Sequence, residues 1–407
     1  MSDALRGRWL LCWLLFGATA LSFLDRQILS VLAPVLTAEF GMTNTDYSRV
    51  VFAFQLSYTV MFSVGGRLMD LVGTRAGMAI SVLVWSIASG AHALATGAAG
   101  LAAMRFFLGV GEGSCFPAAT KGAVEWFPIE KRVLAIGIAN GGSAFGAVAA
   151  PPLTALLATR LGWRGAFLIT GALGLLWVVA WLAAFRYAPG ANVRATSGTA
   201  KRTSVASLLR DPQVRWVLAA RFLFDPVFYF YMFWIPQYLS RERGLSLQQI
   251  GSYYWVPFLV LGVSNIAAGH ISDQLVRRGW PAHRARRVLL TCAALITPVS
   301  WLAALAPNIE WAIVLMACLM LAHGFWISNF LGLLSDVFPS GTIATVTGLT
   351  GTAGGIGGML SSLAVGPLVD RFSFVPAFIA SGLLYPAALI VMAAGGVFRR
   401  ASSGESK

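Results

Sequence analysis

Charged residues are scarce in this chain. Asp, Glu, Lys and Arg make up 11% of its 407 residues, whereas soluble domains carry about 25%. Hydrophobic residues account for 57% of the chain, and its mean hydropathy is +0.73. This composition excludes an ordinary soluble fold, because too little polar surface is available to cover one.

Cysteine and histidine are also sparse, with four of each. The histidines are scattered singly, and no cysteine spacing indicates a disulfide framework or a metal site. The chain also lacks the Gly-x-x-x-x-Gly-Lys-Ser/Thr loop that cradles the phosphates of ATP. We therefore expect no cofactor and no metal, and the absence of clustered catalytic residues argues against an enzyme.

Long apolar runs fill most of the sequence. Runs of about 20 residues are typical of membrane-spanning helices, and the short alternating segments of membrane β-barrels are absent. The sequence therefore predicts an all-α membrane protein with twelve spans in the lipid bilayer. They lie near residues 9–37, 46–66, 76–95, 100–124, 134–159, 166–186, 213–240, 249–271, 286–306, 311–334, 343–368 and 374–398.

The net charge of +14 is distributed unevenly between the predicted loops. Basic residues concentrate in the tails and in the loops on the same side as the N-terminus. The opposite loops hold few, namely Arg49, Arg160, Arg164, Arg241, Arg243 and Arg371. This is the positive-inside bias. It predicts that both termini are cytoplasmic, and it accounts for the charge without a nucleic-acid partner.

The sequence divides into two halves that echo each other. A polar stretch after the sixth span predicts a first six-helix bundle over 1–188, a cytoplasmic linker over 189–212 and a second bundle over 213–407. "GRLMD" after the second span corresponds to "GHISD" after the eighth, and "EWFP" after the fourth to "DVFP" after the tenth. An internal duplication explains both pairs. Such folds bind their substrate near the bilayer midplane, where the halves face each other.

These motifs resemble the major facilitator superfamily. "GRLMDLVGTR" (66–75) fits that family's loop signature, with Gly66, Asp70, Gly73 and Arg75 at its defining positions. "FLDRQILSVLAP" and "RFFLGVGEGSCFPAATK" resemble its anion:cation symporter branch, and the seventh and tenth spans are similar to bacterial hexuronate transporters. The resemblance implies a proton-coupled secondary transporter, a monomer in the bacterial inner membrane. The tenth span has Phe-Trp-Ile-Ser-Asn where many relatives have Trp-Trp-Ser-Ala-Asn.

Six charged residues fall well inside the predicted spans: Asp25, Arg26, Arg105, Glu112, Arg221 and Asp225. A charge at the centre of a membrane helix costs at least about 2.5–3.5 kcal/mol, so such residues pair or line a wet cavity and mark functional sites. Burial and a neighbouring arginine act in opposite directions on a carboxyl pKa. We therefore expect Asp25 and Glu112 to couple transport to protons, and Arg26 and Arg105 to bind a substrate carboxylate with their planar forks.

Spacing gives the expected geometry of these charges. Arg105 and Glu112 are seven residues apart and share a helical face, but about 10 Å of helix axis separates them. To couple, they need a group between them or long side chains, and Asp25 is the natural third member if the first and fourth spans face each other. Arg221 and Asp225 are four residues apart and can bond directly. Asp225 fits either a structural or a functional role, and His323 either a packing residue or a proton relay.

Further polar and aromatic residues in the spans suit a hydroxyl-rich ligand. The candidate substrate-binding set comprises Gln55, Tyr58, Asn140, Arg221, Tyr229, Trp326 and Asn329, besides Arg26 and Arg105. Asp70, Arg75 and Asp273 are candidate gating residues through ion pairs between the halves.

The sequence as a whole therefore predicts proton-coupled uptake of a small organic anion. A sugar acid such as a hexuronate is the first expectation. An aromatic or short-chain carboxylate is the alternative. Drug efflux fits less well, because efflux pumps for apolar cations have little use for arginines in the cavity.

Overall fold

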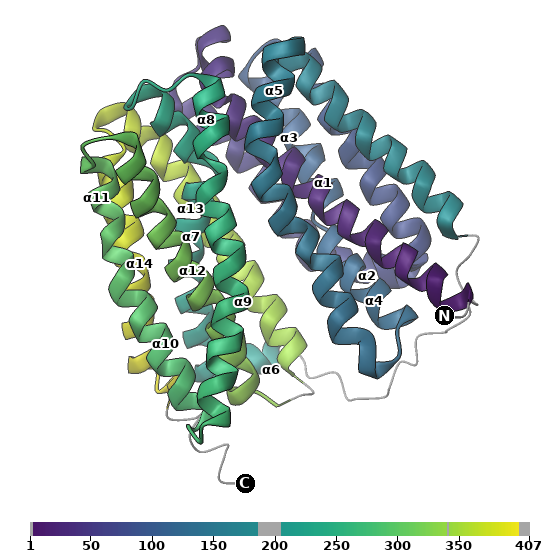
Figure 1. Cartoon of the computed structure of the whole chain (residues 1–407), viewed down its shortest axis with the longest axis vertical. Coiled ribbons are helices and arrows are strands. Elements are labelled where there is room, and N and C mark those ends of the chain that lie inside the picture. Colours follow the sequence, from purple (N-terminus) through teal and green to yellow (C-terminus); the bar gives the residue numbers. More distant parts are fainter. Residues whose placement is uncertain (1–2, 186–204, 340–341, 399–407) are drawn as a thin grey trace. The chain divides into compact units, whose positions relative to one another are not determined.

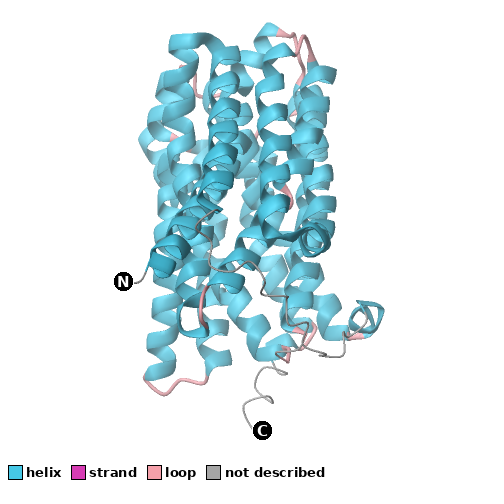
Figure 2. Ribbon diagram, turned by 90° about the vertical axis from the view of Figure 1, so that its right-hand side faces the viewer, coloured by secondary structure: helices cyan, strands magenta, loops and turns pink. Residues whose placement is uncertain are grey.

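The computed structural model of the chain describes residues 3–185, 205–339 and 342–398. Within these ranges the side chains of residues 3–6, 70, 129, 130, 133 and 344 are not described. Every regular element in the described part is a helix (Figures 1 and 2). This confirms the all-α prediction.

The first half of the described chain contains two helices of about double length. α2 (Asn44–Ala91) has 48 residues and α5 (Ile129–Ala184) has 56. Each contains one glycine with positive φ, at Gly73 (80°) and Gly162 (73°). Glycine adopts this conformation without strain, and the chain turns there between two membrane passes. The other elements are α1 (Asp3–Glu39), η1 (His92–Leu94), α3 (Ala98–Glu112) and α4 (Cys115–Trp126).

The second half is built from helices of mostly single length. α7 (Pro212–Arg241), α12 (Ile309–Val337) and α13 (Ile343–Arg371) have 29 or 30 residues each, about 45 Å at 1.5 Å per residue. Each is long enough to cross a bilayer with a tilt. The remaining elements are α6 (Val205–Arg210), α8 (Leu247–Tyr253), α9 (Trp255–Arg277), α10 (Ala282–Ile296), η3 (Thr297–Val299), α11 (Ser300–Leu305) and α14 (Val375–Ala394).

The helix bounds agree with twelve membrane passes. Nine helical segments in the described residues are long and apolar enough to span a bilayer, and one of them, Leu134–Ala184, contains two passes across Gly162. The predicted spans 46–66 and 100–124 fall in the first part of α2 and in α3 with α4. Within the span predicted near 100–124, regular helix stops at Glu112 and resumes at Cys115.

Two predicted loops also differ from expectation. The signature segment 66–75 is helical except at Gly73, so it forms a tight kink rather than an open loop. Most of the predicted linker (189–212) lies outside the described residues, and its described end contains the short helix α6.

The chain separates into two compact units. Unit 1 comprises Met1–Gly198 together with Ile235–Trp255, and unit 2 comprises Thr199–Trp234 and Val256–Lys407. The bundle boundaries drawn from the sequence remain a prediction.

The internal echo in the sequence has a structural counterpart at the helix ends. In unit 1 the Glu125 carboxylate of "EWFP" accepts a hydrogen bond of 2.7 Å from Thr74, directly after the Gly73 kink. In unit 2 the Asp336 carboxylate of "DVFP" forms an ion pair with Arg286, near the start of α10. The acidic residue of each motif, Glu125 or Asp336, therefore bonds to a residue near a helix junction of its own unit. This similarity supports the internal duplication.

Candidate functional site

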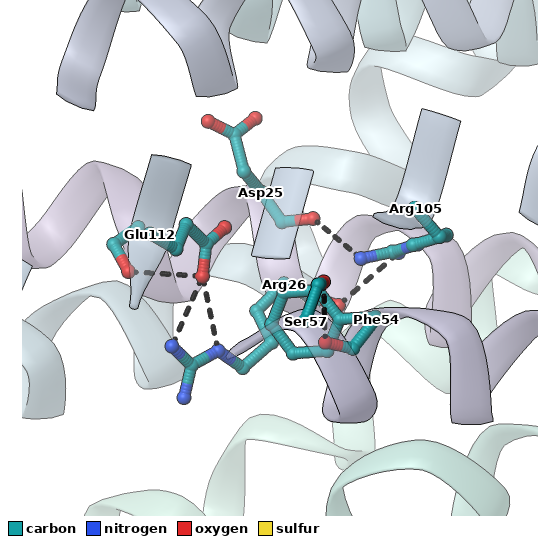
Figure 3. Close-up of polar contacts among 7 residues, drawn as sticks. Asp25, Arg26, Phe54, Ser57, Arg105 and Glu112 are labelled. Carbon is teal, nitrogen blue, oxygen red and sulfur yellow. Dashed lines mark hydrogen bonds and ion pairs between the residues drawn. The ribbon is translucent and has the colours of Figure 1, made fainter. Parts of the chain in front are cut away.

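A cluster of buried charges occupies unit 1. Asp25 and Arg26 lie on α1, while Arg105 and Glu112 lie on α3. Their exposed fractions are 1%, 3%, 0% and 0%. The structure therefore brings together the four charged residues that the sequence places in the first six spans, and Figure 3 shows them side by side.

The Glu112 carboxylate is bound through only one of its oxygens. Its Oε2 accepts hydrogen bonds from Arg26 Nε at 3.2 Å, from Arg26 Nη2 at 3.0 Å and from Ser22 Oγ at 3.1 Å (Figure 3). Its Oε1 is buried and has no hydrogen-bond partner among the described residues. Glu112 can therefore gain a proton on Oε1 without giving up an existing bond.

Aromatic rings surround the Arg26 guanidinium. Its carbon lies 4.6 Å from the ring centroid of Phe23, 5.3 Å from that of Phe54 and 4.4 Å from that of Tyr58. Cation–π contacts of this kind are worth about 0.5–2 kcal/mol each. They stabilise the guanidinium away from bulk water and leave its fork as the group that meets a carboxylate.

Arg105 binds backbone rather than a carboxylate. It donates hydrogen bonds to the carbonyl of Asp25 at 3.4 Å and to the carbonyl of Arg26 at 3.3 Å (Figure 3). Arg26 therefore links Arg105 to Glu112, and the Asp25 carboxyl does not lie between them. The side chain of Arg26 donates hydrogen bonds to Glu112, and the carbonyl of Arg26 accepts one from Arg105.

Glycines in "RFFLGVGEG" allow α3 to approach α2 this closely. A Cβ on Gly109 would lie 2.2 Å from Ser57 Oγ and 2.5 Å from the Phe54 carbonyl oxygen. A Cβ on Gly111 would lie 2.6 Å from the backbone nitrogen of Trp85, in the second part of α2. Close contact between helices through small residues is common in membrane proteins. Here it packs α3, which contains Arg105 and Glu112, closely against α2.

The Asp25 carboxyl points away from the Arg26–Glu112 pair (Figure 3). Its Oδ1 accepts a hydrogen bond of 2.7 Å from Ser89 in α2, and the Ser89 hydroxyl lies 3.2 Å from that of Thr170 in α5. Sequence analysis missed Ser22, Ser89 and Thr170. Single hydroxyl residues are common in apolar helices and make no recognisable pattern, so no sequence signal distinguishes these three.

The other candidates in unit 1 differ in their environments. Gln55 is 2% exposed, and both polar atoms of its amide lack hydrogen-bond partners among the described residues. Asn140 is half-buried, and its Oδ1 has no partner in the same part of the chain. Arg75 is exposed with its guanidinium 5.5 Å from the ring centroid of Phe185, and the side chain of Asp70 lies outside the described residues.

In unit 2 the half-buried Arg221 is bonded to the buried Asp225. Arg221 Nε donates to Asp225 Oδ2 at 2.7 Å, within one turn of α7. The Arg221 guanidinium carbon also lies 5.3 Å from the ring centroid of Phe224 and 5.9 Å from that of Phe330. This direct bond agrees with the four-residue spacing.

The remaining candidates in unit 2 differ in their environments. Trp326 is fully buried, 5.5 Å from Phe224 and 5.3 Å from Tyr385 between ring centroids. The amide of Asn329 donates to the Phe325 carbonyl at 2.8 Å. The ring of Tyr229 stacks on Phe233 with centroids 6.2 Å apart, and Asp273 is exposed.

Fold and sequence together define a multi-pass membrane protein of the transporter class. The family model described as Major Facilitator Superfamily matches residues 15–362, and the chain belongs to this family. It is 32% identical to the hexuronate transporter of Escherichia coli strain K12 over 388 residues, covering 91% of this chain and 90% of that protein. It is 30% identical to the galacturonate transporter of Dickeya chrysanthemi over 306 residues, covering 71% and 88%.

Solved structures show the same fold. A crystal structure of a bacterial homologue of the human lysosomal transporter Spinster matches with a TM-score of 0.76 at 18% identity, covering 96% of both chains. The chain therefore has the fold of this superfamily.

Proposed function

We propose that the protein imports a sugar acid, most simply a hexuronate, together with protons. The observation that carries this proposal is the Arg26 guanidinium, held between the Glu112 carboxylate and the rings of Phe23, Phe54 and Tyr58. The names of the relatives from Escherichia coli and Dickeya chrysanthemi support the substrate class. The protein would act as a monomer in the bacterial inner membrane with both termini in the cytoplasm.

In this proposal the anion and Glu112 compete for Arg26. While Glu112 is ionised, its Oε2 occupies the guanidinium fork at 3.0 and 3.2 Å. Protonation of Oε1 removes the negative charge, and the fork then favours the substrate carboxylate, which stays ionised. Proton and anion thus bind with positive coupling, and each raises the affinity for the other by the same factor. When the site opens to the opposite side, loss of the proton lets Glu112 displace the anion.

The remaining candidates have supporting parts in this scheme. Gln55, Tyr58 and Asn140 would bind substrate hydroxyls in unit 1, and Arg221, Tyr229, Trp326 and Asn329 would contribute from unit 2. Arg105 would hold the α1 backbone in place beside the bound anion. Asp70, Arg75 and Asp273 would latch the cytoplasmic gate.

Replacement of Glu112 tests the coupling. Glu112→Gln keeps the size of the side chain and a neutral acceptor for Arg26, so we expect exchange of labelled for unlabelled substrate to persist in proteoliposomes. Accumulation driven by a pH gradient should fall to the level of empty vesicles. Glu39→Gln is a matched control, because Glu39 is also a carboxylate of unit 1 paired with an arginine, Arg164 at 3.0 Å. Concentrative uptake by Glu112→Gln would overturn the proposal.

A ligand panel tests the substrate class. A bound ligand stabilises the folded protein according to its concentration and affinity. We expect hexuronates to raise the Tm of the purified protein, and aromatic or short-chain carboxylates to leave it unchanged. The opposite result would favour the alternative carboxylate transporter. Uptake with and without a potassium diffusion potential would then reveal the net charge moved, at about 2.3 kcal/mol per charge per 100 mV.

A further inference from the structure

The Asp25 carboxyl has surroundings unlike those of Glu112. It is 1% exposed, and its Oδ1 accepts a hydrogen bond from a hydroxyl, Ser89 Oγ at 2.7 Å, instead of from a guanidinium. The hydroxyl of Thr170 lies 3.2 Å from Ser89 Oγ, and Thr170 Oγ1 is also 3.2 Å from the carbonyl oxygen of Phe167. These contacts form one chain that runs from Asp25 through two hydroxyls to a backbone carbonyl.

The packing of two helices builds this chain. Ser89 precedes Gly90 near the end of α2, and Thr170 precedes Gly171 in the second part of α5. A Cβ on Gly171 would lie 2.7 Å from the backbone nitrogen of Gly90, so only glycine permits this approach. The close contact places the two hydroxyls next to each other and opposite Asp25 on α1.

The chain gives Asp25 Oδ1 a hydrogen-bond partner in both protonation states, while Oδ2 has none among the described residues. A hydroxyl donates one hydrogen and accepts others, and either Ser89 or Thr170 can be the donor in their mutual bond. When Asp25 is ionised, Thr170 donates to Ser89 and Ser89 donates to Asp25 Oδ1. When Oδ1 carries the proton, Asp25 donates to Ser89, Ser89 to Thr170, and Thr170 to the Phe167 carbonyl. The Asp25–Ser89 and Ser89–Thr170 bonds survive with their direction reversed, and the bond from Thr170 to the Phe167 carbonyl forms when Oδ1 carries the proton.

We propose that Ser89 and Thr170 are positioning residues that form a reversible hydrogen-bond chain for Asp25, which exchanges its proton in this pocket and not in competition for Arg26. This inference rests on the proposed proton coupling and extends it. The charged groups that act on Asp25 or are acted on by it are Arg105 and Glu112 on α3, and Arg26 is its neighbour on α1. His92, one turn beyond Ser89, is hydrogen-bonded through Nδ1 to the Ala88 carbonyl. Arg105, which binds the carbonyls of both Asp25 and Arg26, connects this pocket to the anion site.

Removal of one hydroxyl is the direct test. Hydrogen bonds to charged groups exceed neutral ones by about 1 kcal/mol, so the ionised form of Asp25 loses more than the protonated form when Ser89 is replaced. We expect Ser89→Ala to move the pH midpoint of concentrative uptake by about one unit towards alkaline pH. Thr170→Val should move it less, and Thr170→Ser, which retains the hydroxyl, should not move it.

A matched control lies one turn away on the same helix. Ser86 is 1% exposed, as is Ser89, but it lies against Gly174 of α5, and its hydroxyl has no hydrogen-bond partner among the described residues. Ser86→Ala should therefore keep the wild-type pH profile. Exchange of labelled substrate at the optimal pH should persist in Ser89→Ala, which shows that this variant folds and binds.

Further comparisons separate failure of the inference from failure of the proposed function. An unchanged profile in Ser89→Ala, or an equal shift in Ser86→Ala, would refute the hydroxyl chain while wild-type uptake still follows the pH gradient. Wild-type uptake that ignores the gradient would instead refute the proton coupling. If the shift acts through Asp25, adding Ser89→Ala to an Asp25→Asn protein should cause no further change of the pH profile. Both changes remove the same interaction.

Discussion

Each unit of the molecule contains an arginine bonded to a buried carboxylate, and the two pairs differ in how they are held. In unit 1 the Arg26–Glu112 pair joins two helices, and one Glu112 oxygen has no hydrogen-bond partner among the described residues. In unit 2 the Arg221–Asp225 pair lies within one turn of α7, with the carboxylate against Gly354 of α13. A pair that bridges helices changes its surroundings when either partner is neutralised. A pair within one turn is local, and its two charges remain neighbours whichever way other helices move.

The largest expected difference concerns the arginines themselves. Lysine keeps the charge and loses the planar fork that binds a carboxylate through two parallel bonds. One hydrogen bond to a charged group is worth about 1.5–3 kcal/mol, so Arg26→Lys should weaken anion binding roughly 10- to 150-fold. Arg221→Lys should weaken it less than about threefold, since Asp225 already takes up this charge. Equilibrium binding of a labelled sugar acid by both variants checks the comparison, and equal losses would mean that the anion uses both arginines.

A smaller effect is expected where α13 touches the pair of unit 2. A Cβ on Gly354 would lie 1.8 Å from Asp225 Oδ2, so Gly354→Ala forces the carboxylate to move or the helices to separate. Overpacking of this kind costs about 1–3 kcal/mol. We expect a lower Tm in detergent for Gly354→Ala. Gly348→Ala on the same helix should retain the wild-type Tm, because a Cβ there has no neighbour within 4 Å. Equal melting of the two variants would show that the α13 contact does not constrain Asp225.

The two pairs also show which contacts can be predicted from the sequence. A four-residue spacing on one helix fixes local geometry, so the Arg221–Asp225 bond follows from the sequence alone. The spacing of Arg105 and Glu112 likewise places both on the face of α3 that approaches α1. The identity of the group between them does not follow from spacing, because it depends on how α1 is rotated. Rotation turns Arg26 towards Glu112 and Asp25 towards Ser89, 64 residues away in the chain.

The hydroxyl and backbone groups that bond to the buried charges cannot be predicted from the sequence. Arg105 binds two carbonyl oxygens, which every residue possesses, so no sequence signal predicts these contacts. Ser89 and Thr170 matter because Gly90 and Gly171 bring their helices together. The glycines of α3 were visible in the sequence, but a glycine does not reveal which helix will approach it.

The smallest effect is expected at His323, for which the sequence left both a packing role and a proton relay open. The imidazole Nδ1 is hydrogen-bonded to the Tyr385 hydroxyl, and the ring stacks on Phe228 with centroids 5.3 Å apart. A relay needs this hydroxyl, whereas a packing residue needs mainly the two rings. Tyr385→Phe keeps the ring and removes one hydrogen bond, so we expect a stability loss of about 0.5–1.5 kcal/mol and an unchanged number of protons per substrate. Proton uptake measured with labelled substrate in the same proteoliposomes decides the matter, because a lower proton count in Tyr385→Phe would make His323 part of the pathway and give unit 2 a titratable role comparable to that of Glu112.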